Sequence, residues 1–214
     1  MEVSKEPASF RQGSAKCEEN AEGDVEDSIL IFKKSEVSGD LQMQVAALIN
    51  SAWPGLYSPP GVHLHDPLLS PVSMLLVDQG KVLSSLVILS KRITHCGQNY
   101  AASGLSSVVT LKEARGKGHG RRLVIAAREF IRSQDKDLGI FTSDAYLRPF
   151  YESCGWQVLP NSVLIGGTAD QPFASDQFDK VTYASFFTQK AIEKAESFRN
   201  SRIALYPGLI DKLW

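Results

Sequence analysis

The stretch from Val108 to Arg122 reads Val-Val-Thr-Leu-Lys-Glu-Ala-Arg-Gly-Lys-Gly-His-Gly-Arg-Arg. Its β-branched start predicts a buried strand, its alternating glycines predict a tight turn, and the residues from about Gly120 to Ser133 predict a helix. Glycine has no Cβ, so backbone N–H groups in such a turn can approach an anion closely. The first turn of a helix adds N–H groups that lack intrahelical partners, together with a favourable dipole end. The stretch therefore predicts a cradle for a pyrophosphate.

The glycine spacing does not fit two common phosphate-binding motifs. A P-loop requires Gly-x-x-x-x-Gly-Lys-Ser/Thr, and a dinucleotide fingerprint requires Gly-x-Gly-x-x-Gly early in a βαβ unit. Here the glycines alternate at 116, 118 and 120, and they occur late in the chain. A plain flexible connection is the structural alternative, which the alternating glycines and the cations around them disfavour. Those cations are Arg115, Lys117, Arg121 and Arg122.

The composition indicates a globular protein with no global attraction to nucleic acid or to anionic membranes. The chain has 214 residues, a net charge of −1, 43% hydrophobic residues and 22% charged residues. No apolar run reaches about 18 residues, so no membrane-spanning helix is expected. The three cysteines, Cys17, Cys96 and Cys154, are not closely paired and no signal segment precedes them, which predicts a reducing, cytoplasmic setting. No Cys/His spacing matches a zinc site, and no metal is predicted.

The order of apolar patterns predicts an α+β fold with a mostly antiparallel sheet. Strands are expected at 28–33, 73–78, 81–90, 100–111, 137–142, 156–165 (in two parts) and 180–187. Helices are expected at 38–52, at 120–133, from Asp144 to Gly155, and at 189–199. Residues 1–27 are predicted to be a disordered tail, and 166–179 a polar loop. The loop at 54–71 contains five prolines and is long enough to be functional.

Two motifs together resemble the GNAT superfamily of N-acetyltransferases. Arg115, Gly118 and Gly120 match the pattern Arg/Gln-x-x-Gly-x-Gly/Ala of its coenzyme A loop. The run from Asp144 to Trp156, Asp-x-x-Leu-x-x-Phe-Tyr-x-x-x-Gly-Trp, looks like the family's Asn-x-x-Ala-x-x-Leu-Tyr-x-x-x-Gly-Phe. The expected strands and helices also follow the family order. The resemblance implies the GNAT fold, with a mixed sheet of six to seven strands flanked by helices, for residues 28–187.

The resemblance implies an acetyltransferase in which an amine attacks the thioester of acetyl-CoA directly. Tyr151 stands where the family has its general acid and would protonate the leaving thiolate; the pKa of a tyrosine is about 10, so it is protonated at neutral pH, and that of a thiol is about 8.5. No covalent enzyme intermediate is needed, so Cys154 is interpreted as a packing residue, and Trp156 as core. The implied coenzyme-binding residues are Val108, Val109, Thr110, Arg115, Gly116, Lys117, Gly118, His119, Gly120 and Arg121.

The general base is left open by the sequence. Many family members have a carboxylate on the central strand, where this chain has Ser106 and Ser107. Asp144 is one candidate base, and a helix N-cap is its alternative role. His63, His65 and Asp66 in the long loop are the other candidates, and solvated loop residues are their alternative. A metal site at the two histidines is weaker, because no third ligand is evident.

The region 188–214 is expected to be a helix and a tail that packs near the acceptor cleft. Aminoglycoside 2′-N-acetyltransferases look similar and end in an Asp-x-Trp-like tail; here the end is Asp211-Lys-Leu-Trp214. If this tail covers the cleft, Asp211 and the terminal carboxylate would attract a polyamine sugar. A docking tail or a dimer contact is the alternative, and the sequence leaves a homodimer open. The expected acceptor-binding residues are Ser106, Asp66, Asp211 and Trp214.

The leading functional hypothesis is therefore acetylation of a small amine by acetyl-CoA, with an aminoglycoside-like amine as one such acceptor. Acetylation of a peptide or protein amine is the alternative within the same class. A coenzyme A-binding module without catalysis is the alternative from another class, suggested by the absent central-strand acid. No nucleic-acid or membrane partner is expected.

Overall fold

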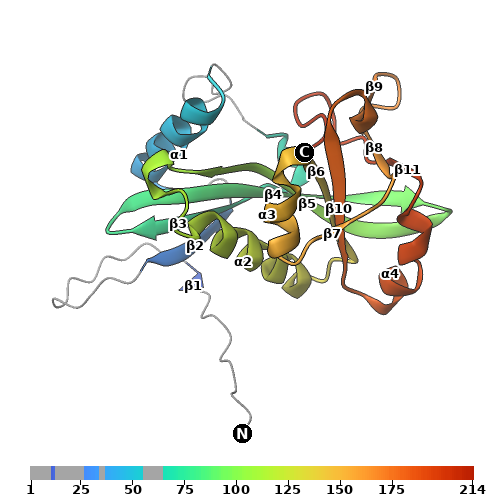
Figure 1. The fold of residues 1–214 in the computed structure, drawn as a ribbon, viewed down its shortest axis with the longest axis horizontal. Helices are drawn as coiled ribbons and strands as arrows, with labels where there is room; N and C mark the ends of the chain where they lie inside the picture. The colour runs from blue at the N-terminus through green and yellow to red at the C-terminus, as the bar shows by residue number, and fades with distance from the viewer. Residues whose placement is uncertain (1–10, 13–26, 34–36, 55–64) are drawn as a thin grey trace, which may run out of the picture.

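The computed structural model describes residues 11–12, 27–33, 37–54 and 65–214 of the chain. Its main element is an eight-stranded sheet in the order β1-β2-β3-β4-β5-β6-β10-β7 (Figure 1). The pairs β1–β2 and β5–β6 are parallel and the other pairs are antiparallel. The strands are β1 Arg11–Gln12, β2 Ser28–Lys33, β3 Val72–Asp78, β4 Lys81–His95, β5 Gln98–Thr110, β6 Leu138–Asp144, β7 Gln157–Val158 and β10 Lys180–Phe186. The predicted α+β class is confirmed.

Helices cover both faces of this sheet (Figure 1). Helix α1, Gly39–Ala52, packs on one face, and helices α2, His119–Ser133, and α3, Arg148–Ser153, pack on the other. Strand β3 shows the cause, because successive side chains of a strand point to opposite faces. Met74 and Leu76 belong to the core beneath α2, whereas Leu75 and Val77 belong to the core beneath α1. An unbroken apolar run therefore builds two cores.

The hairpin of β4 and β5 is longer than predicted. The sequence predicted strands at 81–90 and 100–111, but pairing continues to His95 and resumes at Gln98. The turn consists of Cys96 and Gly97, whose φ angles of 46° and 73° are both positive. Two such residues form the tight turn whose twist matches that of the flanking strands, so the ladder continues to the tip.

A second sheet corrects the prediction for residues 156–179. Strand β8, Val163–Gly167, does not continue β7 but pairs with β9, Pro172–Ala174, and β11, Arg202–Ala204. The break falls at Pro160, which has no N–H for a ladder, and at Asn161, whose φ is 51°. The predicted polar loop at 166–179 was therefore wrong for β9 and for the 3₁₀ turn that follows it.

Short 3₁₀ turns replace parts of the predicted loops and helices. The helix predicted at 189–199 is a short α4, Gln189–Glu193, followed by a 3₁₀ turn, and the one predicted after Asp144 begins as a 3₁₀ turn. The 3₁₀ turns are η2 Pro67–Leu69, η3 Lys112–Ala114, η4 Ala145–Leu147, η5 Ser175–Gln177 and η6 Ala195–Phe198.

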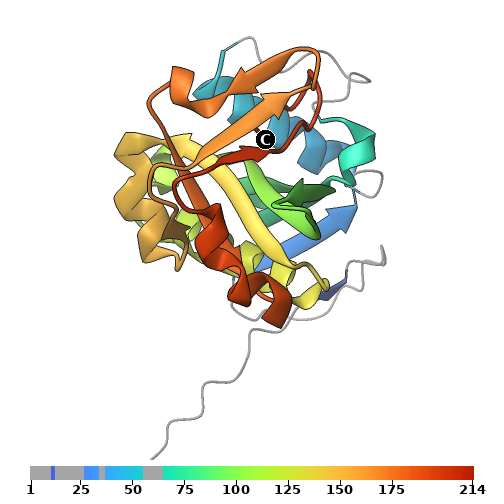
Figure 2. The same cartoon turned by 90° about the vertical axis from the view of Figure 1, so that its right-hand side faces the viewer.

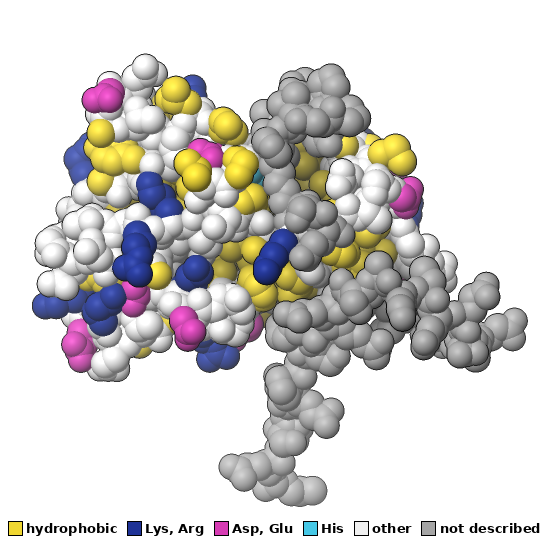
Figure 3. Space-filling model, turned by 180° about the vertical axis from the view of Figure 1, so that it is seen from behind, with side chains coloured by type: hydrophobic (Ala, Val, Ile, Leu, Met, Phe, Trp, Pro, Cys, Tyr) yellow, Lys and Arg dark blue, Asp and Glu magenta, His cyan; other side chains and the backbone are white. Residues whose placement is uncertain are grey.

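The predicted disordered tail is only partly described. Arg11 and Gln12 form β1 and pair with Leu30 and Ile31, contrary to the prediction for these two residues. Residues 1–10 and 13–26 lie outside the described residues, and so do 34–36 and 55–64. No helix in the described part is long and apolar enough to cross a membrane. Acidic and basic side chains are interspersed on the described surface seen in Figure 3.

The segment after β11, residues 205–214, is called the tail below, and it runs between the two sheets. Gly167 of the second sheet donates its N–H to the carbonyl of Lys212 at 2.8 Å. The indole of Trp214 donates to the carbonyl of Ile140 on β6 at 2.9 Å. Figure 2 shows the C-terminus of the chain at this position. The absence of a Cβ at Gly166 is required here, because one would lie 1.6 Å from the Lys212 carbonyl oxygen.

Candidate active site

The central parallel strands separate soon after they meet. Strands β5 and β6 pair only at Ala102 with Leu138 and at Ser103 with Gly139. From Gly104 to Thr110, β5 pairs with β4 on one side and has no β6 partner on the other. This part of β5 therefore presents an unpaired backbone edge inside the molecule.

Strand β5 contains a bulge within this stretch, which pairs with β4 but not with β6. Ser85 of β4 lies opposite Val109 and Val87 lies opposite Ser106, so Ser107 and Val108 share one position on the partner strand. Ser107 has a φ of 51°, in the left-handed region. A β-bulge of this kind bends the strand and redirects side chains. The side chains from 106 to 108 are accordingly half-buried, whereas those from 102 to 105 are buried.

The glycine cradle follows directly at the end of β5. Helix α2 begins at His119, one residue earlier than predicted, with Gly118 at a φ of 85° as its N-cap. A Cβ at Gly118 would strain the backbone, whereas one at Gly120 would lie 2.7 Å from Oγ1 of Thr110. The glycines thus let the first turn of α2 approach the end of β5. The anion cradle at its amide groups stays a prediction.

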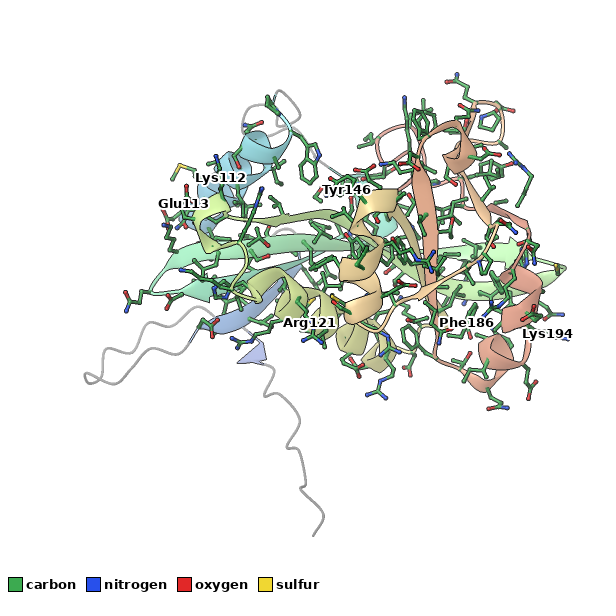
Figure 4. All side chains as sticks on the ribbon, in the orientation of Figure 1. Lys112, Glu113, Arg121, Tyr146, Phe186 and Lys194 are labelled. Atoms are coloured by element: carbon green, nitrogen blue, oxygen red, sulfur yellow. The ribbon has the colours of Figure 1, made fainter. Side chains whose placement is uncertain are left out.

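Three of the cations around the cradle form hydrogen bonds or ion pairs with neighbouring residues. Arg115 Nε donates to the carbonyl of Thr110 at 3.1 Å, and Arg121 donates to the carbonyl of Ser153 at 3.0 Å. Arg122 forms an ion pair with Asp27. Figure 4 shows Lys112 and Glu113 at the end of β5 and Arg121 on α2. Lys117, between Gly116 and Gly118, is exposed and available to a phosphate.

Tyr151 lies on α3 among aromatic rings. Its ring centroid is 5.0 Å from that of Phe141, 5.0 Å from that of Phe150 and 5.1 Å from that of Tyr183. Burial raises the pKa of the Tyr151 hydroxyl well above its usual value, and the neighbouring Tyr183 adds to this. The hydroxyl therefore keeps its proton at neutral pH, and its role as a general acid stays a prediction.

Two neighbours of Tyr151 have structural roles, as predicted. Cys154 is buried, and burial raises the pKa of its thiol, so the reactive thiolate is disfavoured. Trp156 is 2% exposed and packs edge-to-face against Phe141 at 4.8 Å. Among the described residues, the Nε1 of Trp156 is the buried side-chain polar atom that has no hydrogen-bond partner.

Asp144 stands at the end of β6 and pairs with Lys180 at 2.5 Å. It occupies the N-cap position of η4, but its side chain makes no capping hydrogen bond there. The alternative role as a helix N-cap is therefore wrong, because the carboxylate pairs with Lys180 on β10 and makes no hydrogen bond to the helix start. Its role as a base stays a prediction.

A buried histidine and aspartate meet beside the bulge. His65 Nδ1 is 2.5 Å from Oδ1 of Asp211, and His65 Nε2 is 3.4 Å from Oγ of Ser107. The N–H of Asp66 donates to Oδ2 of Asp211 at 2.8 Å, while the Asp66 carboxylate accepts from the N–H of Leu68. Both His65 and Asp211 are buried. The predicted site residues of the loop and the tail are thus brought together, and His63 lies outside the described residues.

Sequence reasoning missed this contact because 146 positions separate His65 from Asp211. No spacing rule connects a loop histidine to a tail aspartate; only the path of the tail between the sheets does so. Ser106, which was expected to bind the acceptor, is half-buried at the bulge.

A pocket of about 390 Å³ opens on the side where the tail and the second sheet meet. It is lined by Thr142, Phe173, Phe178, Lys180, Leu213 and Trp214. Its walls are mainly apolar, and the ammonium group at its rim is the one paired with Asp144. Trp214, predicted to bind the acceptor, is therefore a pocket residue. In the described residues, no group of three His, Cys, Asp or Glu side chains could hold a metal ion.

Residues 32–159 match the family model described as an acetyltransferase (GNAT) domain. The match covers more than half of the chain, and the chain belongs to this family of acetyltransferases. GNAT acetyltransferases use acetyl-CoA, in agreement with the predicted cosubstrate. No curated protein matches the chain.

Solved structures share the fold at low sequence identity. Escherichia coli ElaA is 17% identical with a TM-score of 0.51, over 73% of this chain and 98% of that one. An acyl-CoA N-acyltransferase from Pseudomonas aeruginosa is 15% identical with a TM-score of 0.52, over 74% and 99%. An aminoglycoside 6′-N-acetyltransferase complexed with coenzyme A is 16% identical with a TM-score of 0.50, over 74% and 97%. At these identities the likeness concerns the fold and does not define the acceptor.

Proposed function

We propose that this protein transfers an acetyl group from acetyl-CoA to the nitrogen of a small amine. The observation that carries the proposal is the separation of β5 from β6 immediately before the glycine cradle. The free edge at Val108, Val109 and Thr110 can pair with the amide groups of a pantetheine arm. The cradle from Gly116 to Arg121 then receives the pyrophosphate at the end of that edge.

The backbone of this edge and the side chain of Tyr151 on α3 have separate roles in the proposed reaction. A backbone N–H at the bulge polarises the thioester carbonyl, where negative charge develops during attack. The Tyr151 hydroxyl, which stays protonated at neutral pH, supplies a proton to the departing thiolate. Cys154 takes no part, since its thiol is buried and protonated.

The pocket supports an acceptor with an apolar or aromatic body. Phe173, Phe178 and Trp214 supply apolar surface, and the charge of Lys180 is paired with that of Asp144. Asp211, expected to attract a polyamine sugar, is 6% exposed and already bound to His65. We therefore propose an arylalkylamine-like acceptor in preference to an aminoglycoside.

The test is thiol release from acetyl-CoA with four kinds of acceptor. Tryptamine, spermidine, tobramycin and a short lysine peptide represent arylalkylamines, polyamines, aminoglycosides and protein amines. We expect the highest kcat/KM with tryptamine. Activity on the peptide alone would reject the small-amine proposal. Tight binding of coenzyme A without turnover on any amine would identify a binding module instead.

A further inference from the structure

We propose that His65 is the general base of the acetyl transfer, oriented by Asp211 and connected to the acceptor amine through the hydroxyl of Ser107. This inference rests on the proposed function, and it supplies the base for which the central strand carries no carboxylate. The three side chains come from the loop before η2, from the tail and from the bulge of β5.

Asp211 defines which nitrogen of His65 can accept a proton. A carboxylate only accepts hydrogen bonds, so the 2.5 Å contact requires that His65 Nδ1 carries the hydrogen. In the neutral ring Nε2 then carries the lone pair that accepts a proton, and Ser107 Oγ lies 3.4 Å from it. The N–H of Asp66 holds the second carboxylate oxygen at 2.8 Å. The carboxylate is thus fixed at both oxygens, which fixes the ring in turn.

Ser107 connects this buried pair to the reaction site. Its left-handed φ of 51° belongs to the bulge, at which β5 has already left β6. The hydroxyl lies 3.4 Å from His65 Nε2, and the residue is half-buried rather than sealed. It is also adjacent in the chain to Val108, the first residue of the edge proposed to bind the pantetheine arm. A proton leaving an amine at that edge can pass to Ser107 and from there to His65.

Burial of both partners argues against a merely incidental contact. A buried histidine and carboxylate lose the hydration of their polar groups, which costs free energy unless hydrogen bonds replace it. Here the Asp66 N–H, the His65 ring and the Ser107 hydroxyl form a continuous series. The other carboxylate in this loop, on Asp66, faces the N–H of Leu68 instead of the ring.

The proton balance of the transfer is complete with these groups. An acceptor ammonium gives one proton to Ser107 as the Ser107 hydroxyl proton moves to His65 Nε2, and the neutral amine results. The C–N bond then forms and the C–S bond breaks. The nitrogen of the acceptor loses a second proton when the amide forms, and this proton replaces the one that Tyr151 gives to the thiolate. His65 releases its proton to solvent, so each turnover yields an amide, coenzyme A thiol and one free proton.

The variants His65→Gln, Asp211→Asn and Ser107→Ala test the inference, with tryptamine or the most active amine of the panel. We expect His65→Gln to lower kcat/KM at pH 7 by about 100-fold or more, as for loss of a general base. The loss of kcat/KM should become smaller near pH 10, where an alkylamine with a pKa of about 10 loses its proton to solvent. Asp211→Asn and Ser107→Ala should lower kcat/KM less than His65→Gln does at pH 7, and these losses should also become smaller near pH 10. The KM for acetyl-CoA should stay within about 3-fold in all three.

His95→Gln is the matched control, because it also removes a buried imidazole, at the far end of β4. It should change thermal stability and leave the pH profile unaltered. A proton NMR spectrum gives a readout without an acceptor: a downfield Nδ1–H resonance should disappear in His65→Gln and Asp211→Asn and persist in Ser107→Ala.

Two results would overturn the inference while leaving the proposed function intact. One is an active wild-type enzyme whose His65→Gln defect is equal at pH 7 and pH 10. The other is an acetyl group found on Ser107 by mass spectrometry, since that would make Ser107 a nucleophile. Wild-type inactivity on every panel amine would instead overturn the proposed function and the inference with it.

Discussion

The indole Nε1 of Trp214 donates a 2.9 Å hydrogen bond to the carbonyl of Ile140, between the two strands that separate at the centre of the sheet. Gly104 faces the same indole from β5. The tail thus closes part of the opening that the strands leave, and it forms one wall of the pocket proposed to receive the acceptor. The fold and this pocket therefore depend on the same contact.

Replacing Gly104 by alanine should displace this indole. The new Cβ would lie 2.3 Å from Trp214 Nε1 and 2.6 Å from the Ile140 carbonyl oxygen. Overpacking of this kind costs about 1–3 kcal/mol of unfolding free energy, measurable by urea denaturation. Gly39→Ala is the control, because a Cβ there meets nothing within 4 Å. Equal stability of the two variants would contradict the packing described here.

Trp214→Ala should separate acceptor binding from coenzyme binding. The substitution removes a pocket wall and the bond to Ile140, whereas the glycine cradle is formed by other elements. We expect the KM of the acceptor to rise about 10-fold, as loss of about 1.4 kcal/mol of binding implies. The KM of acetyl-CoA should change far less. A uniform rise of both constants would show that the indole only supports the fold.

Gly120→Ala should weaken coenzyme binding through one identified clash. The added Cβ would lie 2.7 Å from Oγ1 of Thr110, so either the Thr110 side chain must leave its contact with Ser84 or the first turn of α2 must move away from β5. We expect the Kd of coenzyme A, measured by calorimetry, to rise at least 10-fold. The double variant Gly120→Ala/Thr110→Ala removes the obstructing oxygen and should recover part of the affinity. Additive effects of the two substitutions would exclude this cause.

Tyr151→Phe should lower kcat while leaving coenzyme binding unchanged. The substitution keeps the ring contacts with Phe141 and Phe150 and removes only the hydroxyl. Loss of a general acid typically lowers a rate by about 100-fold or more. Stopped-flow thiol release and the Kd of coenzyme A measure the two effects separately. A wild-type kcat would remove Tyr151 from the mechanism.

Asp137 should give the fold an acid-sensitive contribution to stability. Burial raises its pKa, but hydrogen bonds from Lys190, the Ala101 amide and Thr188 outweigh burial and lower the pKa overall. A lowered folded-state pKa stabilises the protein above the unfolded value of about 3.9, and this contribution is lost as the pH falls through the folded-state pKa. Asp137→Asn should therefore be less stable by about 2 kcal/mol at pH 7. In urea titrations the difference should narrow below about pH 4, and a constant difference would contradict the assignment.

Local sequence signals predicted the elements whose structure depends on neighbouring residues. The apolar alternation of β3, the helical period of α2 and the alternating glycines from 116 to 120 are properties of short segments. These signals predicted the α+β class and the cradle, and the two motifs predicted the family. They could not predict the second sheet, because β11, one of the two partners of β8, follows it only after β10 and α4, and the strands pair through backbone groups that every residue has.

The sequence by itself thus determined the glycine turn and the helix start at which the coenzyme is proposed to bind, since both depend on neighbouring residues. Only the tertiary structure decided the arrangement at the proposed acceptor end. The meeting of His65, Ser107 and Asp211 depends on the bulge of β5 and on the path of the tail between the sheets. Both result from packing over long chain distances, which no local pattern records.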